Sequence, residues 1–471
     1  MINLIKGYQE RFILLGLLLL AFVSRFIFIS STDISHDEPF SIFHSQAGVP
    51  EIIQRLKPYN NPPLFEIILH FWTKITGGIS PIQVRSLSLL FSVLTIVPLF
   101  LMVNKFKGKL VAISVCLIFI FSSYHIGFSH EARTYSMWLF FTVCSIYYFS
   151  ILISELNSKK LHLALYIFFT TLMLYSHFFA IWVIFSQGIF LLLFNRNKLF
   201  SKPILISFSV ILVLFLPYIK IILVRFTDSA SSGTWVETPP PSELYETIRK
   251  FCNQPVIAIA FIGSFILSVT KIKNDLFLKY LLIAFVVPFF SIFLLSYKIP
   301  MFVDRYLIFT SIPFYILSAS SLIPFIKNAK SNFMLLVLPL IMILTCNYDP
   351  RLKYENSKVA NLIPKYKNET VGVIYTPEWI DINMYYYLDK KLFNSPNDYK
   401  KMARKKNYFA TNNVDEVPSY KIIILIEGEK NYLDKSRENY KKLKNKYPIA
   451  IEIKDKDGTN FEGYIVTLFS N

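Results

Sequence analysis

The stretch Arg11–Pro39, RFILLGLLLLAFVSRFIFISSTDISHDEP, is an apolar run that ends directly in a cluster of histidine and acidic residues. A helix needs about 20 apolar residues to cross the hydrocarbon core of a bilayer, and this run supplies them. It continues through Ile29 without a small-residue cleavage site, so we interpret it as a retained first span and not as a signal peptide. We therefore expect His36-Asp37-Glu38 at a water–membrane interface.

Similar apolar runs recur as far as residue 346. Hydrophobic residues make up 54% of the 471 residues and charged residues only 17%, unlike a soluble protein. Lipid offers no hydrogen-bond partner to an open backbone, so each run is expected to be helical. The chain is predicted to be a polytopic α-helical membrane protein with about 11 transmembrane helices.

The net charge of +18 would indicate nucleic acid as the partner of a soluble protein. Here much of the excess lies in short loops between spans, which argues against nucleic acid and for the lipid bilayer. The positive-inside rule places the lysine-rich loops in the cytoplasm. This predicts a multi-pass protein of the cell (inner or plasma) membrane, with a cytoplasmic N-terminus and an extracytoplasmic C-terminus.

A change of composition at Asn347 divides the chain into a predicted transmembrane catalytic domain, 1–346, and an extracytoplasmic domain, 347–471. The second part is rich in Lys, Asn, Asp, Glu and Tyr and has no further span. Alternating and charged patterns predict a small α/β domain there. Its expected elements are strands at Val371–Tyr375, Lys421–Ile426 and Ile449–Ile453 and a charged helix at Lys430–Lys446.

Two segments on the predicted outer face are too long for plain connectors. In residues 31–81, helical spacing at 51–56 and a short aromatic run at 64–75 predict two amphipathic helices at the membrane interface. Residues 225–254 contain a Ser-Gly cluster and Pro239-Pro240-Pro241. That composition fits a mobile gating loop and a stiff spacer equally well.

The carboxylates Asp37 and Glu38 are the first candidates for chemistry. Most neighbouring acidic residues on a protein surface are simply solvated. A carboxylate beside a membrane and next to aromatic residues such as Phe40 can instead have a raised pKa and act as a general base.

Two further motifs carry cations on the same predicted face. Ser129–Tyr135 reads SHEARTY and includes His130, Glu131 and Arg133; it fits a helix N-terminus, but an arginine entering a span also needs a partner or an anionic ligand. In the sequence DRYL, Asp304 and Arg305 either end a helix or extend their side chains toward water. Alternatively, Arg305 and Tyr306 form a phosphate clamp, because a guanidinium suits phosphate oxygens.

His177 and Arg25 leave several interpretations open. A lone histidine in a turn is more often structural than functional. As a ligand for a divalent metal, His177 would need partners from Asp37, Glu38 or His36. Arg25, late in the first span, either extends its side chain outward to water or joins the cluster of polar residues.

Taken together, these motifs resemble the bacterial branch of the protein mannosyltransferase family, whose relatives include the lipid A aminoarabinose transferases. These are integral-membrane glycosyltransferases of the GT-C fold. The resemblance covers about residues 10–346. The motifs, in chain order, are Asp37-Glu38, Asn61-Pro62-Pro63-Leu64, Glu131-x-Arg133-x-Tyr135, Tyr175-x-His177-Phe178 and Phe302-x-x-Arg305-Tyr306-Leu307.

The resemblance implies transfer of a sugar from a polyprenyl-phosphate carrier to a cell-envelope acceptor at the outer face, with inversion. Asp37 would be the general base with Glu38 beside it. Arg305 and Tyr306 would bind the donor phosphate, and Arg133 would assist there or brace the carboxylates. Relatives often carry His or Lys where this chain has Asn61, so one cation is missing.

The resemblance also assigns less central roles. Glu131, His130, Asn61 and Tyr135 would support the site. A divalent metal occurs in some relatives, with His177 and Glu38 as its possible ligands here. The low glycine content and abundant Lys, Asn and Ile are typical of an AT-rich bacterial genome, which favours an undecaprenyl carrier.

The main alternative function is a polytopic lipid or solute transporter or flippase. A transporter places its ionisable residues near the middle of spans and often has internal repeats. In this sequence they gather at one end of the spans, and no repeat is evident. A scaffold that only presents the C-terminal domain would not explain why Asp37, Glu131 and Arg305 share a side.

Overall fold

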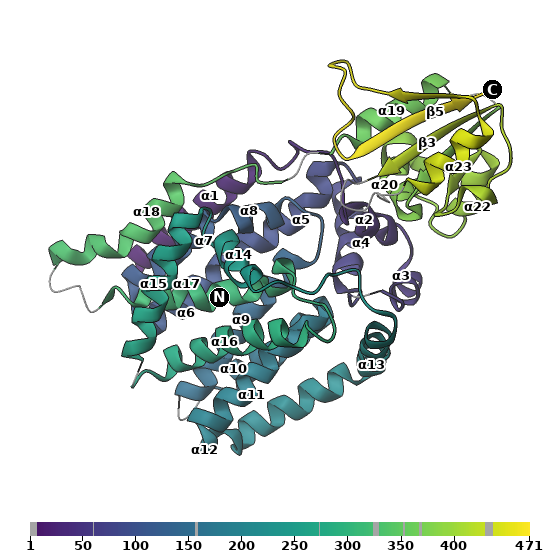
Figure 1. The fold of residues 1–471 in the computed structure, drawn as a ribbon. Helices are drawn as coiled ribbons and strands as arrows, with labels where there is room; N and C mark the ends of the chain where they lie inside the picture. Colours follow the sequence, from purple (N-terminus) through teal and green to yellow (C-terminus); the bar gives the residue numbers. More distant parts are fainter. Residues whose placement is uncertain are drawn as a thin grey trace. The chain divides into compact units, whose positions relative to one another are not determined.

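The computed structural model of the protein describes residues 7–59, 61–155, 159–272, 274–323, 329–351, 354–366, 370–428 and 437–471. Helices dominate up to Thr345 and a sheet follows near the C-terminus (Figure 1). The helices of the first part are α1 (Tyr8–Phe26), α2 (Glu38–Ser45), α3 (Val49–Leu56), α4 (Leu64–Thr76), α5 (Pro81–Leu94), α6 (Ile96–Lys107), α7 (Lys109–Ile120), α8 (Ser123–Ser129), α9 (Tyr135–Ser154), α10 (Lys160–Ser176), η2 (Phe178–Ala180), α11 (Ile181–Phe194), α12 (Arg196–Leu199), α13 (Lys202–Ser232), α14 (Ser242–Phe251), α15 (Pro255–Lys271), α16 (Leu276–Leu295), η3 (Asp304–Thr310), α17 (Ser311–Ser320), η5 (Ala329–Leu336) and α18 (Val337–Leu344).

The second part alternates short helices with strands. Its elements are α19 (Asn356–Tyr366), β1 (Val371–Thr376), η6 (Glu378–Ile380), α20 (Asp381–Leu388), α21 (Lys390–Phe393), α22 (Tyr399–Lys405), β2 (Tyr408–Ala410), η7 (Val414–Glu416), β3 (Ile422–Gly428), α23 (Glu438–Lys446), β4 (Ile449–Ile453) and β5 (Tyr464–Ser470).

The chain forms two compact units that do not follow the sequence order. Unit 1 consists of Met1–Ile29, Ile53–Phe65 and Arg85–Pro350. Unit 2 consists of Ser30–Ile52, Glu66–Val84 and Arg351–Asn471. Most of the segment 31–81 therefore belongs to the same unit as the C-terminal sheet. The two short helices expected in that segment are present as α3 and α4.

Among the described residues, four helices are long and apolar enough to cross a membrane: Pro81–Lys107, Tyr135–Ser154, Lys202–Ser231 and Leu276–Leu295. Counting each of two bent helix pairs as one span raises the number to six. The sequence predicted more spans than this. Some of the predicted spans, such as Lys160–Ser176, form helices that are too short, and α1 carries three charged residues, Glu10, Arg11 and Arg25. A count of about 11 stays a prediction.

Unit 1 contains a broken helix that is held by a buried arginine. α7 stops at Ile120, and α8 leaves at an angle of 62°. The fully buried Arg25 of α1 donates from Nη2 to the carbonyl oxygen of Phe119 (3.2 Å) and from Nη1 to that of Ile120 (3.2 Å). Its Nε also donates to Ser92 Oγ on α5 (2.8 Å). Arg25 thus satisfies carbonyl groups that the end of α7 leaves without helical partners.

Asn253 binds the other side of the same break. Its Nδ2 donates to the carbonyl oxygen of Phe121 (2.9 Å), and its Oδ1 accepts from the backbone N–H of Ser123 (2.8 Å). An unpaired backbone group in an apolar interior costs free energy, so these bonds allow the chain to change direction there. The segment that follows α8 carries the SHEARTY motif.

Unit 2 contains a five-stranded sheet in the order β2-β1-β3-β5-β4. β1 pairs in parallel with β2 and β3, whereas β5 pairs antiparallel with β3 and β4. The predicted strands correspond to β1, β3 and β4, and the predicted charged helix corresponds in part to α23. Residues 430–436 of that prediction lie outside the described residues. β2 and β5 were not predicted.

α23 packs on one face of this sheet. Leu443 of α23 and the adjacent Tyr447 join a buried apolar cluster with strand residues including Leu425 and Phe469. β-Branched and aromatic strand residues bury apolar area here and so stabilise the domain.

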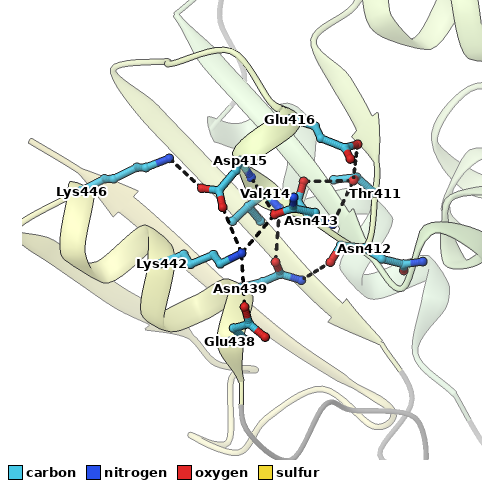
Figure 2. Close-up of polar contacts among 10 residues, drawn as sticks. All are labelled: Thr411, Asn412, Asn413, Val414, Asp415, Glu416, Glu438, Asn439, Lys442 and Lys446. Atoms are coloured by element: carbon cyan, nitrogen blue, oxygen red, sulfur yellow. Dashed lines mark hydrogen bonds and ion pairs between the residues drawn. The ribbon is translucent and has the colours of Figure 1, made fainter.

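Polar contacts attach α23 to the loop Thr411–Glu416 (Figure 2). Asn439 bonds to the loop backbone at 3.1 and 3.2 Å, and Asp415 pairs with Lys442 (2.9 Å) and Lys446 (3.0 Å). Hydrogen bonds from these two ammonium groups hold the pKa of Asp415 below its ordinary value. The pairs are largely exposed, so we interpret them as local anchors of α23 that contribute little to stability.

The Arg25 interaction predicts a large loss of stability on substitution. Arg25→Met should leave buried carbonyl groups of α7 without donors, at a cost of about 1–3 kcal/mol for each group. Thermal unfolding of the detergent-solubilised protein should therefore show a clearly lower midpoint. Arg11→Met, on the exposed side of the same helix, is the control and should change the midpoint little. Equal midpoints for the two variants would contradict this role.

Candidate active site

The predicted carboxylates lie in unit 2, at the start of α2. Asp37 is half-buried and directly precedes the helix, whereas Glu38 in the first turn is fully buried. Glu38 Oε2 lies 2.8 Å from Nη1 of Arg351 and also accepts from the backbone N–H of Ser35 (3.4 Å). A buried carboxylate requires such partners to remain charged. The two neighbouring acids thus differ in burial, because Glu38 is fully enclosed and Asp37 is partly exposed.

His36, immediately before the carboxylates, has a left-handed backbone with φ of +55°. That conformation is uncommon for a residue other than glycine and costs free energy, so it persists only where the surroundings enforce it. The imidazole ring packs edge-on against Tyr354, with ring centroids 4.1 Å apart. The turn that presents Asp37 is therefore held in a conformation that the chain would not favour alone.

The segment that carries His130, Glu131 and Arg133 connects α8 to α9 in unit 1. His130 is buried, and its Nε2 donates to the carbonyl oxygen of Arg25 (2.6 Å). The backbone N–H of Arg133 donates to the carbonyl oxygen of Glu131 (2.7 Å), which tightens the turn. Arg133 is only 7% exposed, and Tyr135 begins α9 as a buried residue.

His177 lies in unit 1, between α10 and α11, with its ring stacked on Trp138 at 4.2 Å. Burial, and then the charges of Arg133 and Arg305, lower the pKa of His177 to about 3. The ring is therefore neutral near pH 7. The backbone N–H of Phe179 donates to Nδ1 (3.2 Å), so the ring proton sits on Nε2. Among the described residues, this buried Nε2–H has no hydrogen-bond partner.

Arg305 and Tyr306 form the first turn of η3, close to His177. The Tyr306 ring lies 5.3 Å from the His177 ring. The Arg305 guanidinium carbon lies 5.6 Å from the centroid of the Tyr306 ring and 5.1 Å from that of Trp235. Thr234, next to Trp235, donates to the carbonyl oxygen of Pro300 (2.6 Å). The second long segment thus contacts the predicted phosphate-binding residues through Trp235.

The structure brings the unit 1 candidates together around His177. The charges of Arg133 and Arg305 act on the His177 ring. Guanidinium groups together with a donor N–H suit an anion with several oxygens. We refer to Arg133, His177, Arg305 and Tyr306 as the cationic cluster. Asn61 is half-buried just before α4, and the carboxylates belong to unit 2.

The residues suggested for a metal fit that role poorly. The lone pair on Nδ1 of His177 accepts a backbone hydrogen bond and Nε2 carries a proton, so the ring has no free donor atom. Two arginine charges near His177 would also oppose a cation. Glu38 is engaged by Arg351. Within the described part of the chain, no group of three or more His, Cys, Asp or Glu side chains is arranged for a metal.

Some structural features differ from what the sequence suggested. Arg25 neither extends to water nor joins the cationic cluster, because its guanidinium is taken up by carbonyl oxygens of α7. Sequence reasoning also missed Trp138, Trp235 and Arg351. The position of Trp235 between the Ser-Gly cluster and the three prolines of residues 225–254 was a weak signal. No local pattern indicated Arg351.

Comparison with known proteins supports the resemblance noted in the sequence. Residues 60–221 match the family described as dolichyl-phosphate-mannose-protein mannosyltransferase. That range contains the SHEARTY motif and His177. No curated protein sequence matches the chain significantly.

Solved structures match over nearly the whole chain. The crystal structure of ArnT from Cupriavidus metallidurans bound to undecaprenyl phosphate has a TM-score of 0.62 at 10% identity, and 98% of each chain is covered. The archaeal oligosaccharyltransferase AglB from Archaeoglobus fulgidus, in complex with an inhibitory peptide and a dolichol-phosphate, has a TM-score of 0.54 at 9% identity. That match covers 89% of this chain and 70% of AglB. The fold is the GT-C glycosyltransferase fold with a small C-terminal sheet domain.

The environment of His177 predicts that its ring stays neutral across the physiological range. Because the pKa is lowered to about 3, histidine ¹⁵N chemical shifts should show no titration of this ring between about pH 5 and 8. Comparison with a His177→Asn variant assigns the signal among the seven histidines. A midpoint near the ordinary value of about 6.5 would contradict the described surroundings of the ring.

Proposed function

We propose that this chain, which has the GT-C glycosyltransferase fold and matches the mannosyltransferase family over residues 60–221, transfers a sugar from a polyprenyl-phosphate donor to a cell-envelope acceptor. The observation that carries the proposal is the cationic cluster, in which the charges of Arg133 and Arg305 act on His177. Among the described residues, the buried Nε2–H of His177 has no hydrogen-bond partner. A phosphate offers several acceptor oxygens to such donors. The undecaprenyl phosphate bound to ArnT and the dolichol-phosphate bound to AglB support a lipid phosphate as the ligand.

In the proposed reaction, the acceptor hydroxyl loses its proton to Asp37 and its oxygen bonds to the anomeric carbon of the sugar. The bond from that carbon to the phosphate oxygen breaks, and the lipid phosphate leaves with the electron pair. A single displacement of this kind inverts the anomeric centre. The chemistry needs a base on one side of the carbon and cations on the other.

The two carboxylates have different roles in this proposal. Glu38 is fully buried and paired with Arg351, so proton transfer to it would require breaking a buried ion pair. Asp37 is half-buried and directly precedes α2, which leaves it more accessible to an acceptor than Glu38. We therefore assign the base to Asp37 and the support of its loop to Glu38.

A neutral His177 suits a lipid phosphate that must leave after each turnover. Its N–H donates one hydrogen bond without adding a third positive charge to the two arginines. Hydrogen bonds to charged groups are stronger than neutral ones, so the donor still favours the developing charge of the leaving phosphate. We also propose an undecaprenyl carrier, which the composition favours. An outer-face reaction and a cytoplasmic N-terminus follow from the topology that the loop charges predict.

Arg305 is expected to determine affinity for the lipid phosphate. Arg305→Lys keeps the charge but loses the planar fork, so binding of undecaprenyl phosphate to the purified protein should weaken by about 1–3 kcal/mol. Trp235→Ala should weaken it less, by about 0.5–2 kcal/mol, because it removes only the cation–π contact. Binding is measured by titrating the lipid into protein reconstituted in nanodiscs.

Arg249→Lys provides a matched control for this binding experiment. Arg249 lies on α14 and pairs with Glu246 at 2.6 Å, so the same substitution there should leave binding unchanged. Equal affinity of the Arg305→Lys and wild-type proteins, both folded, would remove Arg305 from the phosphate clamp.

Asp37→Asn keeps the shape of the side chain and removes its basicity. Turnover should fall by about 10²–10⁴-fold while undecaprenyl phosphate still binds, since the base acts only in the chemical step. Turnover is measured as release of free lipid phosphate from a panel of undecaprenyl-phosphate sugars.

The comparison that decides between the carboxylates is Glu38→Gln. If Glu38 were the base, Glu38→Gln would abolish turnover and Asp37→Asn would retain it, and the assignment made here would be reversed. Asp228→Asn, at the exposed end of α13, should keep wild-type turnover in the same assay.

A further inference from the structure

The loop that presents Asp37 is held by residues from the C-terminal part of unit 2. The backbone N–H of Ile34 donates to the hydroxyl oxygen of Tyr387 (2.6 Å), and the carbonyl oxygen of Ile34 accepts from Asn356 Nδ2 (2.8 Å). Asp33 Oδ2 accepts from the backbone N–H of Ser357 (2.7 Å). Both backbone groups of Ile34 are thus bonded to residues more than 300 positions away in the sequence.

The contacts continue on the other side of the turn. Tyr354 packs against His36, whose backbone is left-handed, and Arg351 pairs with the buried Glu38. Asp37 lies between these two contacts. It is therefore flanked on both sides by residues that the C-terminal segment holds.

The helix that follows is also packed on the C-terminal segment. Phe43 of α2 lies edge-on to Phe393 and Tyr399, with ring centroids 5.5 and 4.9 Å apart. This apolar packing accounts for the position of α2. The position of α2 therefore does not depend on the polar contacts to residues 33–38. Those contacts fix the backbone of the turn itself.

We propose that the C-terminal domain is a positioning element for the reaction: Arg351, Tyr354 and Tyr387 hold the turn 33–38 so that Asp37 points at its target. This inference rests on the proposed role of Asp37. The physical basis is that catalysis by a general base depends on its placement, and a displacement of about 1 Å can cost about 10²-fold in rate. A strained turn such as that at His36 persists only where neighbouring contacts enforce it.

Arg351 contributes through the ion pair with Glu38. Removal of Arg351 leaves a buried carboxylate without its cation, which destabilises the turn. Removal of both charges by Arg351→Gln in a Glu38→Gln background leaves no unpaired charge. If Arg351 acts through Glu38, its substitution should therefore have a smaller effect in that background, as a double-mutant cycle measures.

The experiment uses the full-length protein and two measurements. Hydrogen exchange of peptides that cover residues 33–38 should be about tenfold faster or more in Arg351→Gln and Tyr387→Phe, because their contacts no longer hold the turn. In the same variants, kcat for release of undecaprenyl phosphate from its sugar conjugate should fall about 10- to 100-fold with little change in the KM for the donor. Arg351→Lys, which keeps the charge, should recover part of the loss.

Two variants within unit 2 serve as matched controls. Arg437→Gln breaks a similar pair, in which Arg437 Nη2 lies 2.6 Å from the mostly buried Glu427. Tyr447→Phe removes a hydroxyl that donates to the carbonyl oxygen of Tyr420 (2.8 Å). Neither contact involves residues 33–38. Both controls should keep wild-type exchange in that turn and wild-type kcat.

The outcomes separate this inference from the proposed function. Unchanged exchange at residues 33–38 in Arg351→Gln and Tyr387→Phe would overturn it, and so would faster exchange with an unchanged kcat. If the wild-type protein released no lipid phosphate from any donor of the panel, the proposed function would fail. The exchange rates would then still decide whether the C-terminal residues hold the turn.

Discussion

The need to hydrogen-bond every backbone group inside an apolar helix bundle controls the arrangement of unit 1. α7 ends within the bundle, and its last carbonyl groups would be left without donors if Arg25 were absent. Asn253 satisfies groups on the other side of the break. Because these groups are bonded, the chain can turn by 62° into α8 and place Arg133 after it. The position of a predicted phosphate-binding residue thus depends on a buried arginine that itself binds no ligand in the proposed mechanism.

The candidate site residues differ in how deeply they are buried and in which charges lie near them. Glu38 is buried and has a cation beside it, whereas Asp37 remains nearer to water. The His177 ring stays neutral, because burial and the charges of two nearby arginines lower its pKa. In the proposed function, the ligand of this cationic cluster is the phosphate of the donor.

The contacts of the C-terminal sheet domain with residues 33–38 suggest a role for that domain. Its core is built by apolar strand residues and the packing of α23. It nevertheless shares a compact unit with residues 30–52, which contain the predicted base. A domain that looks like an appendage in the sequence is therefore structurally continuous with the turn around Asp37.

The sequence alone determined the membrane class, the helices α3 and α4, three of the five strands and the motifs of the GT-C resemblance, because each depends on local periodicity or composition. β2 has only three residues and gave no usable pattern, although the β-branched residues of β5 were a signal that could have been used. The pairing of Glu38 with Arg351 and the contact of Trp235 with Arg305 join residues distant in the sequence, so no local pattern predicts them. The neutral state of His177 could not be predicted from the sequence either. It depends on burial and on two arginines from other segments, and only the tertiary structure brings these groups together.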